Sequence, residues 1–272
     1  MDNNSQKPLR DLTIAIKGAG EIATGVAWRL YQANICNIFM MDVEQPLAVR
    51  RQVSFCEAIH EETKTVENIT AVNVNSADEF KKIWAGKYIP VLADPKWKSI
   101  VRVTPDVVID AIIAKQNLGT SVNEAALVIG LGPAFIAPDE VHMIVETNRG
   151  HNLGRVLLEG SAEPNTGIPG NIGGYTVERV LRAPAEGLFV SYKKIGHRVA
   201  TGDVVGVVND TPVIVQIDGM IRGMIKSGII VSTGLKIGDI DPRGEISYCD
   251  TISEKARAIG GSVLEAILRK FN

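Results

Sequence analysis

The stretch IAIKGAGEIATGVAWRL (residues 14–30) decides how the first half of the chain is expected to fold. An apolar, β-rich run leads into Gly18-Ala19-Gly20, and an amphipathic helical pattern follows. Short runs rich in Val, Ile and Leu then alternate with helical patterns, as expected for parallel strands covered on both faces. The predicted strands are 12–17, 38–42, 69–74, 89–93, 107–109 and 127–129, and Ser76 with Glu79 predicts a capping box. This alternation predicts an α/β domain over residues 1–160, with a Rossmann-like, doubly wound parallel sheet.

The second half of the chain contains an internal repeat. Residues 161–175, rich in Gly, Pro, Asn and Thr, are predicted to be a linker. EGLFVSYKKIGHRVATGDVVG (186–206) then aligns with DGMIRGMIKSGIIVSTGLKIG (218–238) at an offset of 32, with four matched glycines and a valine. Two such halves predict a small barrel-sandwich β domain within residues 176–272. That domain is expected to include a C-terminal helix, whose pattern Gly260-Gly261 interrupts.

The predicted second domain resembles domains that carry biotin or lipoate on a lysine between the two halves. Here the joint is Val208-Asn209-Asp210-Thr211-Pro212, which contains no lysine. We therefore expect the fold without covalent biotin or lipoate, including on the neighbouring Lys226 and Lys236.

Composition excludes several classes of function. The 272 residues carry a formal charge of −2, which gives no electrostatic case for binding nucleic acid or an acidic membrane surface. No apolar run approaches the ~18 residues needed to span a bilayer, and the first residues, MDNNSQKPLRD, lack the apolar core of a signal peptide. Three widely spaced cysteines fit a reducing compartment. We expect a soluble, cytoplasmic protein.

The glycine turn after the first strand is a candidate nucleotide site. Gly18, Ala19 and Gly20 would let a pyrophosphate approach the helix N-terminus, and Asp42, at the end of the next strand, could accept a hydrogen bond from a ribose hydroxyl. Asp42 favours an unphosphorylated ribose, although Arg50 and Arg51 could reach a phosphate or simply face solvent. Glu21 would compete with phosphate. The alternative is that small residues only let helix and strand pack closely.

Other candidate residues are expected at the carboxyl edge of the sheet, where open α/β folds bind ligands. These are the second glycine turn with Gly130 and Gly132, together with Lys115 and Asn117 just beyond a strand. Asp94 and Asp110 also follow strand ends and could hold Mg²⁺, but helix capping or a turn is the favoured role of each. No metal site is predicted.

VHMIVETNRGHNLGRVLLEG (141–160) is the richest polar segment. Its alternation predicts a strand, in which His142 and Glu146 lie ~13 Å apart and cannot share a metal. The turn 148–154 presents Arg149 and His151, and Arg155 begins the return strand. The arginines suit a phosphate or carboxylate and His151 suits proton transfer, so they are candidate ligand-binding and catalytic groups. The alternative is a polar hairpin loop.

The cysteines add no stronger candidate for catalysis. Cys56 and Cys249 could act as nucleophiles, but buried structural thiols are favoured.

Eight segments together resemble a known family. They are IKGAGEIATGVAWRL, DAIIAKQNLGT, VIGLGPAF, ETNRGHNLGRV, EPNTGIPG, LRAPAEG, KIGDIDPRG and KARAIGGSVLEAIL, and they span most of residues 12–268. This combination is similar to the accessory family of the selenium-dependent molybdenum hydroxylase system, the YqeB-like proteins. The resemblance implies a role in maturing such hydroxylases, with a nucleotide or the dinucleotide form of the molybdenum cofactor as ligand.

Two hypotheses about function therefore stand side by side. In the first, the chain is an accessory protein whose partner is a client molybdenum hydroxylase. In the second, it is an NAD(P)-dependent oxidoreductase of unknown substrate. Both hypotheses allow a homo-oligomer.

Overall fold

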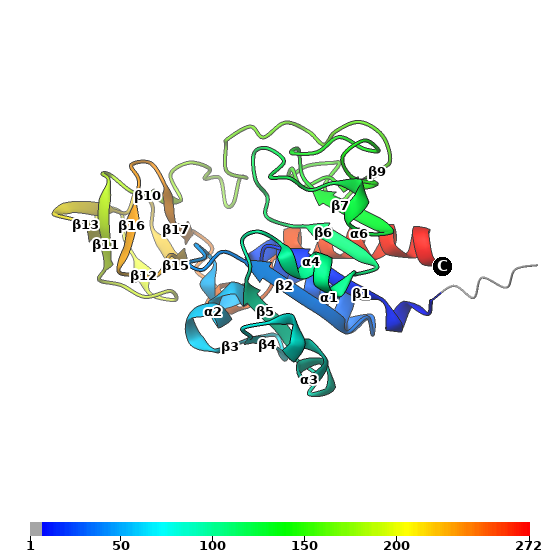
Figure 1. The fold of residues 1–272 in the computed structure, drawn as a ribbon. Coiled ribbons are helices and arrows are strands. Elements are labelled where there is room, and N and C mark those ends of the chain that lie inside the picture. The colour runs from blue at the N-terminus through cyan, green and yellow to red at the C-terminus, as the bar shows by residue number, and fades with distance from the viewer. Residues whose placement is uncertain (1–6) are drawn as a thin grey trace, which may run out of the picture. The chain divides into compact units, whose positions relative to one another are not determined.

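The computed structural model describes residues 7–272 and divides the chain into two compact units (Figure 1). The first unit contains the chain up to Pro46, Ser54–Asn165 and Ile252–Asn272, and the second contains Leu47–Val53 and Thr166–Thr251. The C-terminal helix therefore lies in the first unit and not in the second domain, where the sequence analysis put it. A second difference is Leu47–Val53, an early segment that packs within the second unit.

A nine-stranded sheet forms the centre of the first unit, in the order β3-β4-β5-β2-β1-β6-β7-β8-β9. It is parallel from β4 to β8, and antiparallel β3 and β9 close its two edges. The strands are β1 (Thr13–Lys17), β2 (Asn37–Asp42), β3 (Thr63–Val66), β4 (Ile69–Asn73), β5 (Ile89–Ala93), β6 (Val107–Asp110), β7 (Leu127–Leu131), β8 (Met143–Val145) and β9 (Val156–Leu157).

Helices and short 3-10 turns connect these strands. The helices are α1 (Glu21–Gln32), α2 (Ala58–Glu61), α3 (Phe80–Ala85), α4 (Lys98–Val103) and α6 (Glu254–Phe271), with 3-10 turns η1 (Leu9–Asp11), η3 (Phe55–Glu57), η4 (Ala77–Glu79) and η5 (Val122–Glu124). The capping box predicted for Ser76 and Glu79 is present at η4. A mixed α/β architecture with a large, mostly parallel sheet is confirmed.

Each of the six predicted strands is present, with ends that differ by at most two residues. Their side chains are almost fully buried because helices cover the sheet. Strand β3 was not predicted, because its residues TKTV lie at the edge of the sheet, with only Val66 buried, and give no apolar run.

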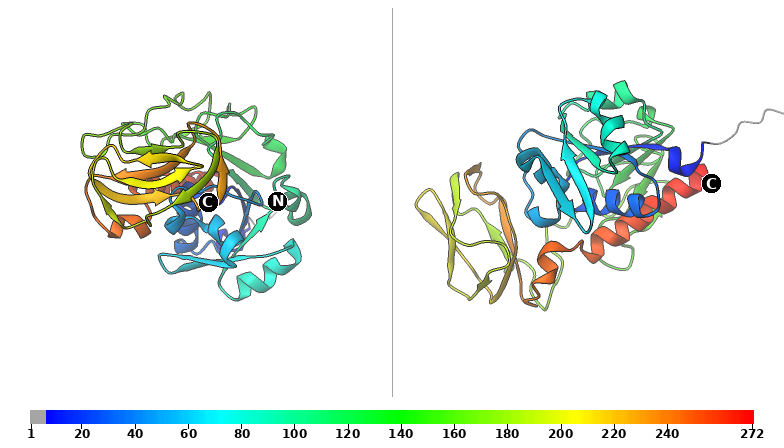
Figure 2. Two further views of the ribbon diagram at one scale, coloured as in Figure 1. Left: turned by 90° about the vertical axis from the view of Figure 1, so that its left-hand side faces the viewer. Right: turned by 90° about the horizontal axis from the view of Figure 1, so that it is seen from below.

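Helix α6 packs along α1 (Figure 2, right). Its helix is unbroken from Glu254 to Phe271, although Gly260-Gly261 was expected to interrupt it. Gly260 lies against the backbone of α1: a Cβ at this position would stand 2.8 Å from the carbonyl oxygen of Gly25. The glycine therefore permits a close helix crossing, which offsets its low helix propensity.

The second unit contains two four-stranded antiparallel sheets, in the orders β10-β17-β15-β12 and β14-β13-β11-β16 (Figure 2, left). Its elements are η2 (Arg51–Val53), β10 (Val180–Arg182), β11 (Gly187–Ser191), β12 (Arg198–Val199), β13 (Val204–Val208), β14 (Thr211–Ile214), β15 (Gly219–Met224), β16 (Ile229–Val231), β17 (Lys236–Asp241) and α5 (Ser247–Asp250).

The sequence repeat is also a structural repeat. Strand β11 pairs with β16 through Gly187 opposite Val231, and β15 pairs with β12 through Gly219 opposite Val199. At the offset of 32, β11 is equivalent to β15 and β12 to β16, so the two pairings are equivalent. The short middle strand of each repeat, β12 or β16, therefore pairs with the first strand of the other repeat. Apolar side chains of both sheets form one core, in which Phe189 and Ile221 occupy equivalent positions.

Candidate functional site

The turn after β1 requires glycine at one position and leaves space at another. Gly18 has φ +88°, and a Cβ there would lie 3.2 Å from the backbone oxygen of Ala111. Gly20 precedes α1 as its N-cap with φ −72°, and no described atom lies within 4 Å of a Cβ built on it. Gly18 is therefore required by the fold, whereas Gly20 keeps the entrance to the helix N-terminus open.

This turn lies where the order of the parallel sheet reverses. Strand β1 lies between β2 and β6. After β1, the chain forms β2 to β5 on one side of β1 and then crosses to form β6 on the other side. In open parallel sheets, ligands bind outside the carboxyl ends of the strands at such a reversal. The Gly18–Gly20 turn occupies that place.

Asp42 lies beside the glycine turn, at the end of β2. Its Oδ2 accepts a hydrogen bond from the backbone N–H of Ala19 at 2.8 Å, and its Oδ1 accepts one from Val43 at 2.8 Å. Burial raises the pKa of Asp42, while these two backbone N–H groups lower it. The carboxylate thus fixes the turn, and a carboxylate with about four lone-pair sites can still accept a further bond.

A buried lysine, which the sequence analysis did not single out, lies directly before the turn. The Lys17 side chain is 0% exposed, and its ammonium donates to Thr120 Oγ1 at 2.7 Å and Glu124 Oε1 at 2.8 Å. Thr120 in turn donates to Asp110 Oδ2 at 2.7 Å. The only sequence signal was a lysine at the end of an otherwise apolar strand. The carboxyl ends of β1 and β6 therefore hold one buried polar cluster.

The two aspartates considered for magnesium have other roles. Asp94 accepts a hydrogen bond from Ser99 N at 2.7 Å at the start of α4. Asp110 accepts from Thr120 and from Ile112 N, and burial raises its pKa. Within residues 7–272, no three His, Cys, Asp or Glu side chains gather as a metal site would need. Turn and cap formation accounts for both carboxylates.

The second glycine turn is shaped by packing. A Cβ at Gly130, inside β7, would lie 2.4 Å from the ring of Phe135. Gly132 has φ +87°, and its Cβ would lie 2.8 Å from Thr147 Oγ1. Both glycines are therefore needed where side chains approach the backbone, a role that the sequence analysis did not assign to them.

Lys115 and Asn117 lie in the loop after β6. Asn117 Oδ1 accepts from the backbone N–H groups of Gly119 and Thr120, and its Nδ2 donates to the oxygen of Thr120. Asn117 thereby positions the threonine that contacts Lys17, whereas Lys115 is exposed.

The turn 148–154 follows β8, whose last residue, Val145, accepts a hydrogen bond from Gly132 N. Buried Glu146 stabilises it by accepting from the backbone of Asn148 and Glu163. His142 lies before β8 and its Nδ1 accepts from Val128 N, so it does not meet Glu146.

The three candidate side chains of this turn differ in their surroundings. Arg149 forms an ion pair with Glu254, the first residue of α6. His151 and Arg155 are exposed. The turn is therefore a hydrogen-bonded hairpin that presents one histidine and one arginine to solvent.

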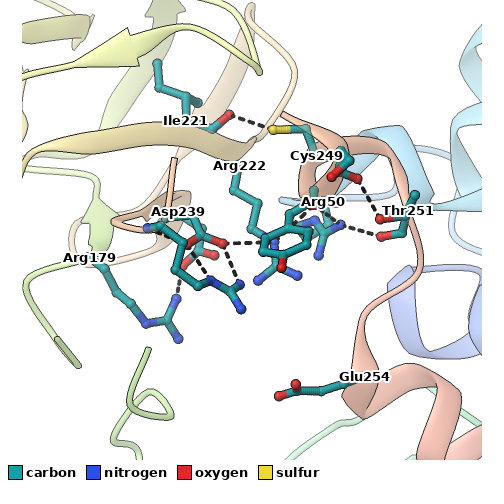
Figure 3. A network of polar contacts seen from close by, with 12 residues as sticks. Arg50, Arg179, Ile221, Arg222, Asp239, Cys249, Thr251 and Glu254 are labelled. Atoms are coloured by element: carbon teal, nitrogen blue, oxygen red, sulfur yellow. Dashed lines mark hydrogen bonds and ion pairs between the residues drawn. The ribbon is translucent and has the colours of Figure 1, made fainter. Parts of the chain in front are cut away.

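Arg50 and Arg51 belong to the second unit, and their guanidinium groups donate to backbone oxygens of that unit. Arg50 is buried and donates to the backbone oxygens of Tyr248 and Thr251 (Figure 3). Arg51 Nε donates to Met224 O at 2.9 Å. Both guanidinium groups anchor the segment 47–53 within the second unit.

The cysteine thiols are poor candidates for nucleophiles. Cys249 is buried and donates to Ile221 O (Figure 3), and burial raises its pKa. Burial also raises the pKa of the Cys56 thiol well above its ordinary value, and the charges of Asp42 and Glu57 add to this effect. Both thiols are therefore held protonated.

The hairpin between the two repeats is short. It joins β13 to β14 through Asn209 and Asp210, and Asn209 adopts φ 51°. The Asn209 side chain accepts from Leu188 N and so fixes the hairpin tip. Lys226 follows β15 and Lys236 begins β17, away from this tip in the sequence.

One curated relative matches most of the chain. YqeB of Escherichia coli (strain K12), described as an uncharacterized protein, is 46% identical over 255 residues, which are 94% of this chain. The chain is a homologue of YqeB. It spans about half of that relative's length, 47%. This identity supports the YqeB-like resemblance, and the relative's description names no activity.

Other comparisons contribute little. No family model matches the chain. The crystal structure of the E. coli tRNA N6-threonylcarbamoyladenosine dehydratase TcdA is 12% identical, with a TM-score of 0.31 over 96% of this chain and 88% of that chain. A succinylglutamate desuccinylase/aspartoacylase from Rhodobacter sphaeroides is 24% identical, with a TM-score of 0.21 over 23% of this chain and 21% of that chain. These scores are too low to inform on function. Within residues 7–272, no helix combines the length and apolar composition that crossing a bilayer requires.

Proposed function

We propose that this chain is an accessory protein in the maturation of selenium-dependent molybdenum hydroxylases. In this proposal its first unit is Rossmann-like and binds a nucleotide, or the dinucleotide form of the molybdenum cofactor, at the Gly18–Gly20 turn. The observation that carries it is the open space at Gly20, directly before α1 and at the reversal of the parallel sheet.

The residues at this turn fit a pyrophosphate. Backbone N–H groups of the first turn of α1 have no partner within the helix, and the helix dipole favours an anion there. A side chain at Gly20 would occupy the space through which a phosphate must approach. Glu21 at the first helical position opposes this binding, so the contacts that hold a phosphate come from backbone.

The client and the cofactor class come from the family resemblance. The 46% identity to YqeB extends that resemblance over 94% of the chain, while the link to selenium and molybdenum comes from the sequence motifs alone.

An NAD(P)-dependent oxidoreductase is the second candidate, and Asp42 favours it. A carboxylate at the end of the second strand, beside the glycine turn, is typical of sites that bind an unphosphorylated ribose. Asp42 meets this description and contacts Ala19 of the turn.

Calorimetry with NAD, NADP, CTP and the cytidine dinucleotide form of the cofactor separates the two candidates. We expect the cytidine ligands to bind to the wild type at the Gly18–Gly20 turn and Gly20→Val to remove this binding, because the new side chain enters the phosphate space. The free energy of unfolding of Gly20→Val should stay near that of the wild type, since no described atom lies within 4 Å of the added Cβ. Equal affinity in both proteins contradicts a ligand at this turn, and binding of NAD alone favours the oxidoreductase.

The turn 148–154 is tested by Arg149→Ala and His151→Ala, with ligand affinity and activation of a client hydroxylase as readouts. Glu254→Ala is the matched control, because it breaks the same ion pair and keeps the guanidinium group. We expect loss of affinity in Arg149→Ala but not in Glu254→Ala. If both turn variants bind and activate as the wild type does, the turn is only a hairpin.

A further inference from the structure

A cavity of about 370 Å³ lies within the second unit and is lined by residues of that unit. Three of its lining side chains are cationic: Arg51, Lys193 and Lys194. The hydroxyl groups of Ser191 and Ser227 and the thioether of Met224 also line it. The volume falls in the range of about 300–1,000 Å³ that is usual for small-molecule sites.

The internal repeat explains why a cavity forms here. Two of its walls are the segments that follow β11 and β15, which are the equivalent first strands of the two repeats. The backbone N–H of Ser191 donates to Ser227 Oγ at 3.0 Å and joins these walls. The third wall is η2, which is not part of the repeat and is fixed by the bond from Arg51 Nε to Met224 O. These contacts fix the walls of the cavity relative to one another.

The charge of the lining is one-sided. None of the described residues that line the cavity is acidic. The carboxylate of Asp203 lies 3.9 Å from the Lys193 ammonium, at the limit of an ion pair, and the described part of the chain places no carboxylate within 4 Å of the Lys194 ammonium. The ammonium groups of Lys193 and Lys194 bring two like charges to one cavity, and an anion with more than one negative charge would be attracted to both.

We propose that this cavity binds a phosphate-bearing small molecule. The guanidinium and ammonium groups of Arg51, Lys193 and Lys194 contact the phosphate oxygens, because charge-assisted hydrogen bonds to phosphate are the strongest contacts such groups make. Buried Met224 and Ile225 form the apolar wall against which the less polar part of the ligand packs. This site does not depend on the proposed function, which requires only the glycine turn of the first unit.

The test is a calorimetric titration of the full chain with inorganic pyrophosphate. Gly20→Val serves as the background, because it removes the anion site proposed for the first unit. We expect one binding site in this background and a loss of about tenfold or more in affinity when Lys194→Ala is added. Lys226→Ala is the matched control: Lys226 is exposed, holds the position of Lys194 in the other repeat and does not line the cavity.

The outcomes are distinct. Lack of pyrophosphate binding in the Gly20→Val background overturns the proposal, and so does an equal loss in Lys194→Ala and Lys226→Ala, which would indicate general surface charge. Lys194→Ala in the wild-type background should leave unchanged the cytidine-ligand binding that Gly20→Val removes. If Gly20→Val removes no cytidine-ligand binding while Lys194→Ala still weakens pyrophosphate binding, the proposed function is refuted and this site stands.

Discussion

The close crossing of α1 and α6 makes two adjacent glycines respond in opposite ways to the same substitution. A Cβ at Gly260 would lie 2.8 Å from the carbonyl oxygen of Gly25 and 2.9 Å from Arg29 Cβ. At Gly261, no described atom lies within 4 Å of the added Cβ. Replacement by alanine therefore meets backbone at the first position and open space at the second.

The expected magnitudes follow from two opposing effects. Alanine is favoured over glycine by ~0.8–1.0 kcal/mol in a helix interior. Extra volume against a packed neighbour that cannot move costs ~1–3 kcal/mol. Gly261→Ala should therefore raise the free energy of unfolding by up to ~1 kcal/mol, whereas Gly260→Ala should lower it by as much as ~2 kcal/mol. The two variants should differ by ~1–3 kcal/mol.

Urea denaturation followed by circular dichroism measures both variants against the wild type. Thermal melting is an independent check, at roughly 2–4 °C per kcal/mol for a domain of this size. Gly25→Ala should behave as Gly260→Ala does, because its Cβ would lie 2.7 Å from Ala256 Cβ. If Gly260→Ala stabilises the protein as much as Gly261→Ala, the two helices are not in backbone contact and the reasoning is wrong.

Three further substitutions test the sheet edge and the second unit. Gly18 has φ +88°, which is unfavourable for alanine, so Gly18→Ala should lower the free energy of unfolding by ~1–2 kcal/mol in urea denaturation. An unchanged free energy of unfolding would contradict the need for glycine in this turn. Lys17→Met leaves the Glu124 carboxylate without its cation, so we expect the free energy of unfolding to fall by ~3–5 kcal/mol in the same measurement. A fall of less than about 1 kcal/mol would show that this ion pair does not stabilise the fold. Burial raises the pKa of Asp241, but hydrogen bonds from Arg243 and nearby arginine charges outweigh it, so the pKa lies below its ordinary value. The carboxylate therefore stabilises the fold at neutral pH and loses that effect as pH falls through its folded-state pKa. Asp241→Asn should destabilise the protein more at pH 7 than at pH 3 in melting curves, and an equal effect at both would refute this.

The buried parallel strands of the first unit could be predicted because their signals are local. Parallel strands covered on both faces must be apolar throughout, and the runs at residues 12–17 and 38–42 show this directly. The repeat at an offset of 32 was visible because each half needs glycine at the same corners. Gly196 and Gly228 both have positive φ, as do Gly202 and Gly234.

The membership of the two units was decided by packing. The C-terminal helix belongs to the first unit because Gly260 lies against the backbone of Gly25 in α1. The sequence shows only that Gly260 lowers helix propensity, since Gly25 lies more than 200 residues earlier in the chain. The segment 47–53 likewise lies between two elements of the first unit, yet hydrogen bonds from Arg50 and Arg51 place it in the second.

The sequence by itself determined the positions of the glycine turn, Asp42 and the polar hairpin, because each depends on residues near in the chain or on adjacent strands. Only the tertiary structure decided that Gly20 is open while Gly130 and Gly132 are filled by neighbouring side chains. It also brought Lys17 to Thr120 and Glu124, across about a hundred residues, when β6 took its place beside β1. The physical reason is the same in each case: whether a small or charged residue meets solvent, a ligand or another side chain depends on which distant segment packs beside it.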